Sequence, residues 1–147
     1  MDPLLLPSAP SVESEVLACL LIDPSKTPQA SARLKGDDFH HNDYRLVWNA
    51  LLESYERHND YDEVILEEVL RDQGTWGRVG GRQLVQLLNR SGTNGRLDSY
   101  VDRLLAMSAR RRMHDAANQI GAIALDGELG PAEAIGEAEA CLLYTSD

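Results

Sequence analysis

The sequence predicts an all-α protein, in which a compact multi-helix globular bundle is followed by a C-terminal helical hairpin. Hydrophobic residues make up 43% of the 147 residues but only one is Phe, so aliphatic side chains must form the core, which favours packed helices over sheets. Apolar residues recur at helical spacing along most of the chain. The segment 96–125 has no proline and a single internal glycine, which predicts a helix roughly 45 Å long.

The N-terminal segments are delimited by prolines. Residues 1–10 contain three of them and predict a disordered, extended leader. Ser11 is placed to cap a helix that Asp23-Pro24 ends, because proline disfavours helical geometry in the residue before it. A short helix is expected over 29–34.

The clearest amphipathic pattern follows at 42–57. His58-Asn59-Asp60 interrupts it, and a second helix is expected over 63–73, with Gly74 as its C-terminal stop. A short helix over 82–89 completes the bundle, so residues 11–95 form the predicted globular subdomain. One face of the 42–57 helix carries Tyr44, Val47, Trp48, Leu51 and Tyr55.

The remaining residues predict a helical hairpin over 96–144, with 145–147 as a tail. Asp126-Gly127 turns the chain, and Pro131 lies where the first turn of a helix tolerates proline. The alanine-rich apolar stripe of the hairpin exceeds what two arms bury between them, so we expect it to need a partner.

The charge and cysteine content exclude several classes of protein. A net charge of −10 repels a nucleic-acid backbone, so DNA binding is not expected of this segment. The apolar runs are too short to span a membrane, and a signal sequence is absent. Cys19 and Cys141 are expected to be buried and reduced, which indicates a cytoplasmic protein.

No residue pattern predicts catalysis, a cofactor site or a metal site. The histidines are not spaced as metal ligands are. Neighbouring carboxylates on a helix point about 100° apart, so they do not form a catalytic pair. The glycines near residue 80 lack the preceding strand and the following Lys of a phosphate loop. The motif G-x-x-x-x-G-K-[ST] is absent, so this segment is not expected to be an enzyme. Arg110–Arg112 fan around a helix and so cannot form one flat phosphate-binding face. Carboxylate pairing or solubility is favoured for them, and contact with an acidic surface on a neighbouring subunit is the alternative. Trp48 and Trp76 are expected to be core anchors.

Five segments, taken in order, resemble the N-terminal domain of bacterial and phage replicative DNA helicases of the DnaB type. Three departures from that family's pattern stand out: Ala18-Cys19 replace paired glycines, Tyr44 replaces a histidine, and Ile65 with Glu68 replaces a Thr/Glu capping box. The matching segments are Glu13–Asp23, Asp37–Val47, Asp62–Leu70, Val79–Leu88, and Tyr100-Val101 with Arg110–Met113.

The resemblance implies an assembly and recruitment domain that forms dimers through its hairpin. Three dimers would form the collar of a hexameric helicase. This collar would dock primase and, in some systems, a loader. ATP, magnesium and DNA would bind a motor domain beyond residue 147. Alternatives are the helicase-binding domain of a primase or a stand-alone helical protein–protein adaptor; a phosphate loop downstream would favour the helicase. The predicted dimer interface, or its immediate support, is Leu97, Val101, Leu104, Leu105, Ile120, Ile123, Ile135 and Leu142.

Overall fold

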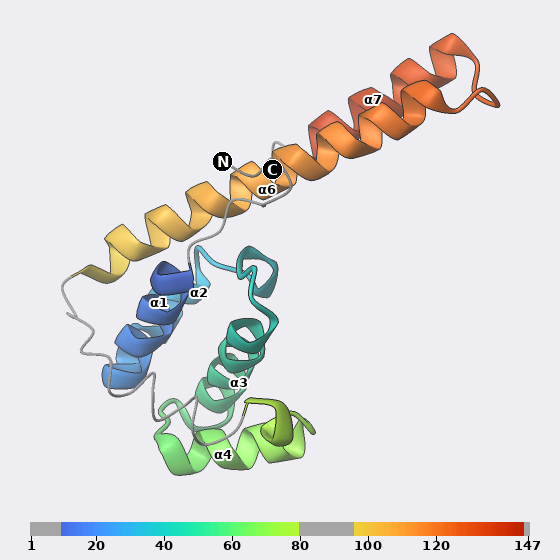
Figure 1. The fold of residues 1–147 in the computed structure, drawn as a ribbon. Helices are drawn as coiled ribbons and strands as arrows, with labels where there is room; N and C mark the ends of the chain where they lie inside the picture. Colours follow the sequence, from blue (N-terminus) through green and yellow to red (C-terminus); the bar gives the residue numbers. More distant parts are fainter. Residues whose placement is uncertain (1–9, 80–95, 146–147) are drawn as a thin grey trace. The chain divides into compact units, whose positions relative to one another are not determined.

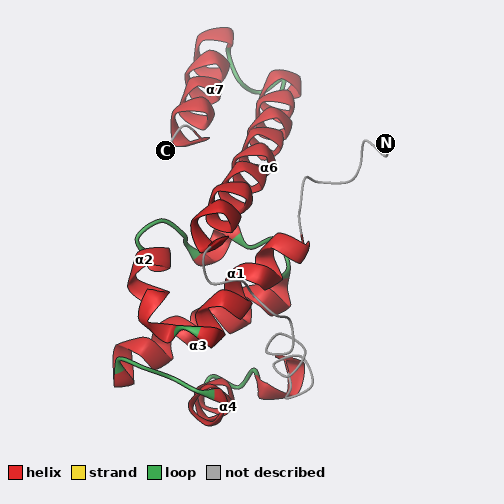
Figure 2. Ribbon diagram, turned by 90° about the vertical axis from the view of Figure 1, so that its left-hand side faces the viewer, coloured by secondary structure: helices red, strands yellow, loops and turns green. Residues whose placement is uncertain are grey.

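The computed structural model describes residues 10–79 and 96–145, with side chains up to residue 143. Every regular element in these residues is a helix (Figure 1 and Figure 2), which confirms the all-α prediction. Residues 1–9 of the predicted leader, the helix over 82–89 and the boundary after residue 95 lie outside the described residues. Pro10, predicted as the last residue of the leader, is already in α1, so Ser11 lies inside this helix and does not cap it. The elements are α1 (Pro10–Ile22), η1 (Pro24–Lys26), α2 (Thr27–Ser31), η2 (Gly36–Asp38), α3 (Asn42–His58), α4 (Glu63–Asp72), α6 (Leu97–Leu125) and α7 (Pro131–Thr145).

The chain divides into two compact units within helix α6. The N-terminal unit is Ser8–Leu105, and the hairpin unit begins at Ala106 and contains the larger, C-terminal part of α6 together with α7. Helix α6 therefore supplies its first turns to one unit and its last turns to the other.

Helix α1 is buried on all sides from Val16 to Leu20, as expected of a stretch in which every residue is apolar. Ala18 and Cys19, which stand where the family has glycines, are fully buried along with the residues on either side. Burial, together with the charge of Glu15, raises the pKa of the Cys19 thiol, which keeps it protonated. Cys19 is buried as predicted, but Cys141 is only half-buried, and neither forms a disulfide.

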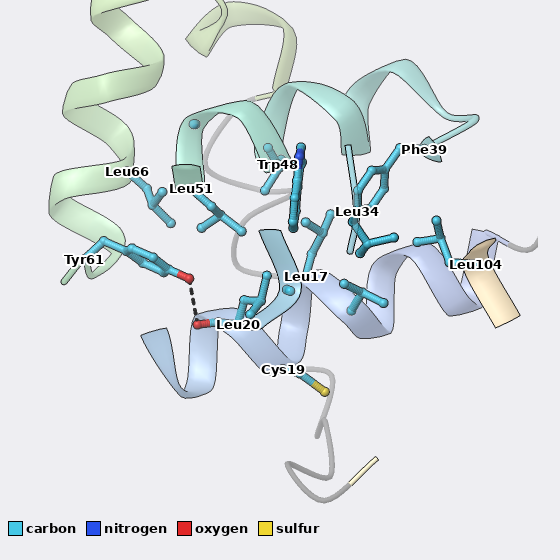
Figure 3. Packing of buried hydrophobic residues seen from close by; sticks show 14 of the residues in the cluster. Leu17, Cys19, Leu20, Leu34, Phe39, Trp48, Leu51, Tyr61, Leu66 and Leu104 are labelled. Carbon is cyan, nitrogen blue, oxygen red and sulfur yellow. Dashed lines mark hydrogen bonds between the residues drawn. The ribbon is translucent and has the colours of Figure 1, made fainter. Parts of the chain in front are cut away.

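The largest core side chain is Trp48, which α3 directs against Phe39 in the loop before that helix. The two ring centroids are 5.2 Å apart, and both side chains have 0% exposure (Figure 3). Helix α4 covers the other end of this core with Leu66, Val69 and Leu70. The amphipathic stripe read from the sequence of α3 thus forms the centre of the N-terminal unit.

The ends of α3 and α4 have identifiable stop and start signals. Asn59 has φ 56° and ends α3 in the left-handed conformation, and Gly74 adopts φ 74° just after α4. Asp62 caps α4, because its carboxylate accepts the Ile65 N–H at 2.9 Å. The capping box expected to be lost at Ile65 and Glu68 is therefore replaced by a cap three residues earlier. Three short helices, η1, α2 and η2, lie between α1 and α3, and the first begins at Pro24, whereas one helix over 29–34 was predicted.

A buried glutamate joins the start of α1 to the start of α3. Glu13 is 2% exposed, and its carboxylate accepts the backbone N–H of His41 at 3.2 Å and lies 3.3 Å from the His41 ring nitrogen Nδ1. A buried carboxylate is tolerated only when hydrogen-bonded, so these contacts fix the chain just before α3 against α1.

Tyr61 joins the C-terminal end of α1 to the beginning of α2. Its hydroxyl donates to the Leu20 carbonyl at 3.0 Å and lies 2.8 Å from Thr27 Oγ1, which in turn donates to the Pro24 carbonyl at 2.7 Å (Figure 3). Burial raises the pKa of the Tyr61 phenol well above its ordinary value.

Replacing Tyr61 with Phe is expected to lower the free energy of unfolding by about 1–2 kcal/mol at neutral pH, because two buried groups lose a partner. The folded state holds the phenolic proton more tightly than the unfolded state. The stabilisation is thus complete below the ordinary tyrosine pKa of about 10 and declines as the pH rises above it. Between pH 8 and pH 10.5, urea denaturation should therefore show a larger decrease in the free energy of unfolding for wild type than for Tyr61→Phe. The control is Tyr100→Phe at a half-buried tyrosine, which should show the same decrease as wild type.

Candidate interaction surface

The hairpin unit consists of two antiparallel helical arms joined by the turn 126–130. The Asp126 carboxylate accepts the Glu128 N–H at 3.0 Å within this turn, and Pro131 begins α7. Cys141 on α7 lies 3.3 Å from Gln119 on α6, measured from Sγ to Oε1, so these two positions are level along the arms. Figure 1 shows α7 beside the last turns of α6.

The arms pack through one narrow strip of each helix. On α6, Ala116 is buried and Ile120 and Ile123 are half-buried; on α7 the half-buried positions are Ala134, Ala138 and Cys141. These spacings of three and four residues define the inner side of each arm.

Large apolar side chains remain exposed on the hairpin unit. Seven large hydrophobic residues are exposed in the described chain, and five of them lie beyond residue 105, although the N-terminal unit is the longer of the two. A concentration of exposed apolar side chains marks an interaction surface, whereas single ones are common on any protein. The five are Met113 (64%), Leu125 (88%), Ile135 (61%), Leu142 (57%) and Leu143 (71%).

The first half of the predicted interface is instead part of the core of the N-terminal unit. Leu97, Val101 and Leu104 are 2%, 1% and 2% exposed, and Leu105 packs partly against the same cluster. Their helical stripe faces the core of their own chain, which leaves them the role of immediate support that the sequence interpretation also allowed. Their possible contribution to an interface is limited to holding α6 in place.

Polar contacts hold the same turns of α6 on the N-terminal unit. Gln29 Nε2 donates to Asp98 at 2.8 Å, and Arg33 pairs with Asp102 and lies 4.0 Å from Asp98. Each of these contacts is on the surface and contributes little to stability. They join the same turns of α6 to α2 and the residues after it that the apolar packing does.

The second half of the predicted interface lies in the hairpin unit. Ile135 and Leu142 are exposed, while Ile120 and Ile123 contribute mainly to the contact between the arms. The sequence interpretation omitted Met113, Leu125 and Leu143 from the interface. Met113 could have been included from its spacing alone, whereas Leu125 and Leu143 lie outside the periodic stripe and gave no such signal.

Two adjacent exposed stripes form one face of the hairpin, here called the hairpin face. On α7 each exposed position follows an inner position by about 100°, and on α6 Ala117 and Ala124 do the same. Met113 and Arg110 continue this α6 stripe at helical spacing before Ala117. Because both helices are right-handed and run in opposite directions, this rotation carries the two stripes to the same side. The α6 stripe contains Arg110, Met113, Ala117 and Ala124, and the α7 stripe contains Ile135, Glu139 and Leu142; all seven are exposed.

Charge is segregated along the hairpin. Residues 106–112 contain three arginines and no acidic residue, whereas 113–145 contain no Lys or Arg. Arg111 is 7% exposed, and Arg110 and Arg112 lie on the surface, so the run does fan around the helix as predicted. The acidic residues of the second segment are Asp115, Asp126, Glu128, Glu133, Glu137 and Glu139.

The other polar groups considered in the sequence have structural roles. Asp38 accepts the Lys35 N–H at 2.8 Å, and Glu67 pairs with Arg71, whose guanidinium lies over the Trp76 ring at 4.9 Å. Among the residues with described positions, no three His, Cys, Asp or Glu side chains gather as a metal site would require. None of the helices in this part of the chain is long and apolar enough to cross a membrane.

A family model and a solved structure both match this chain. Residues 5–105 match the model described as the DnaB-like helicase N-terminal domain. The structure is similar to the crystal structure of the N-terminal domain of DnaB helicase from Mycobacterium tuberculosis, with a TM-score of 0.89 and 22% sequence identity over 96% of this chain and 99% of that one. At that identity the likeness shows the fold. No curated protein matches the chain.

Proposed function

Because this chain belongs to the DnaB-like helicase N-terminal domain family, we propose that it is the assembly and recruitment domain of a replicative DNA helicase. The proposal assigns the ATP-driven motor, with its magnesium and its contacts to DNA, to a separate domain outside these residues. This chain then contributes protein–protein contacts in the cytoplasm and no catalysis.

The observation that carries the proposal is the exposed apolar hairpin face. Met113, Ile135 and Leu142 are each more than half exposed on it, and Ala117 and Ala124 lie between the larger side chains. Small residues at these positions let a second helical pair approach closely, and the larger ones then become buried. The natural occupant is the same face of a sister chain, because a two-fold dimer buries one patch against itself.

Dimers of this kind are the proposed unit of assembly. Three of them would form a collar on the helicase hexamer, and the N-terminal units would dock primase and a helicase loader. The net charge of −10 supports this division of roles, since an acidic domain discourages direct binding to DNA.

Ile135→Asp and Leu142→Asp are each expected to weaken self-association at least about tenfold, because an apolar contact becomes a buried charge and a two-fold interface contains each change twice. Sedimentation velocity with light scattering measures the dissociation constant. The matched control is Val64→Asp, which changes an equally exposed apolar residue (70%) on α4 and should leave association at the wild-type value. A wild-type chain that stays monomeric at high micromolar concentration would contradict the proposal.

A further inference from the structure

Two hydrogen-bond donors on helix α3 are buried and have no acceptor among the described residues. They are the indole Nε1 of Trp48, whose side chain has 0% exposure (Figure 3), and the guanidinium Nε of Arg45. In native proteins nearly all buried N–H groups bond either to the protein or to ordered water, because an unmade hydrogen bond is costly. Arg45 and Trp48 are three residues apart, so both donors lie on one side of α3.

Both side chains lie against one glycine of the turn before α3. A Cβ atom on Gly36 would be 3.9 Å from Trp48 Cδ1, the ring atom bonded to the unpaired Nε1, and 3.7 Å from Arg45 Cγ. Arg45 Nη2 donates to the Phe39 carbonyl at 2.9 Å, which holds the guanidinium beside this turn. The turn therefore brings the two unpaired donors to one place, next to Gly36.

A hydrogen-bond acceptor is present at the same place. Asn49 Oδ1 would be 3.2 Å from the Cβ position of Gly36, and Asn49 is exposed while Gly36 is half-buried, so the place is close to the surface. Two donors and one acceptor match a water molecule, since buried waters typically make about three hydrogen bonds. A small anion could accept from the two donors but could not donate to the amide oxygen.

We propose that Arg45, Trp48 and Asn49 together bind one buried water molecule through these three polar atoms. The water accepts from the guanidinium Nε–H and the indole Nε1–H, and it donates one proton to the Asn49 amide oxygen. Gly36 then has a specific role, because any larger residue would place its Cβ against all three side chains. The site lies within the N-terminal unit and does not depend on the hairpin face.

Nuclear Overhauser spectroscopy between water and the whole chain tests this site. The chain contains two Trp residues, so Trp76→Phe assigns the Trp48 indole proton. We expect a cross-peak between that proton and a long-lived water, which the rotating-frame experiment distinguishes from proton exchange with solvent. Gly36→Ala should remove the cross-peak, because its methyl group fills the space beside the unpaired nitrogens. The matched control is Gly77→Ala, whose Cβ meets no atom within 4 Å and which should keep the cross-peak.

A high-resolution crystal structure of the wild-type chain is the second measurement. It should show a water peak within about 3.2 Å of both unpaired nitrogens. Crystals grown in bromide identify the occupant, since an anomalous peak at this place would assign it to an anion and overturn the proposal. A cross-peak that survives in a folded Gly36→Ala variant overturns the placement of the water. The absence of a water peak beside Gly36 overturns the proposal even if Gly36→Ala fails to fold.

Discussion

Trp48→Ala is expected to lower the free energy of unfolding by about 3–5 kcal/mol, the largest loss of any single truncation in this chain. The side chain extends from α3 and is fully buried in a cluster with residues of α1 and with Phe39. Its removal leaves a cavity that the surrounding helices cannot fill by moving. Its indole nitrogen has no hydrogen-bond partner among the described residues, so packing accounts for most of the predicted loss.

Urea denaturation followed by circular dichroism at 222 nm measures this loss without using tryptophan fluorescence. The matched control is Trp76→Ala, since Trp76 is only partly buried and contacts the Arg71 guanidinium near the surface. That substitution should cost clearly less than half as much. Equal losses for the two tryptophans would contradict the assignment of Trp48 as the centre of the core.

Leu104→Ala is expected to lower the free energy of unfolding by about 2–5 kcal/mol, because α6 inserts this side chain into the core of the N-terminal unit. Leu104 is 2% exposed and lies close to Leu34 and Phe39 (Figure 3). Its loss weakens the attachment of the first turns of α6, so the substitution tests whether this helix is held by its own chain.

The matched control removes the same atoms from the hairpin face. Leu142 is 57% exposed, and Leu142→Ala should change the free energy of unfolding at low protein concentration by less than about 0.5 kcal/mol while weakening self-association. Leu104→Ala is thus expected to reduce stability, and Leu142→Ala is expected to reduce self-association. A Leu104→Ala variant that kept its stability but lost association would return Leu104 to the interface.

Most helix boundaries were predictable because they depend on local chemistry. Asp23-Pro24 ends α1, Gly74 follows α4, and Pro131 begins α7, each for a reason contained within a few residues. The prediction was less accurate where the signals were weak. The helices from Pro24 to Ser31 begin earlier than predicted.

The predicted interface residues divide between two environments for a reason that periodicity does not contain. A helical stripe identifies side chains that avoid water, but a core and a subunit interface satisfy that requirement equally well. Leu104 and Ile135 look alike in the sequence, yet one is buried by its own chain and the other is exposed. The extent of the N-terminal unit, which ends at Leu105, makes the difference.

By itself the sequence determined the helical class, the order of the helices, the family resemblance and the separation of charge along the hairpin. These follow from residue spacing and from the local geometry of proline, glycine and capping side chains. Only the tertiary structure decided which apolar residues were already buried, that Glu13 meets His41, and that Arg110 and Glu139 share one face of the hairpin. Such relations depend on which distant segments come together in three dimensions, and spacing along one helix does not contain that information.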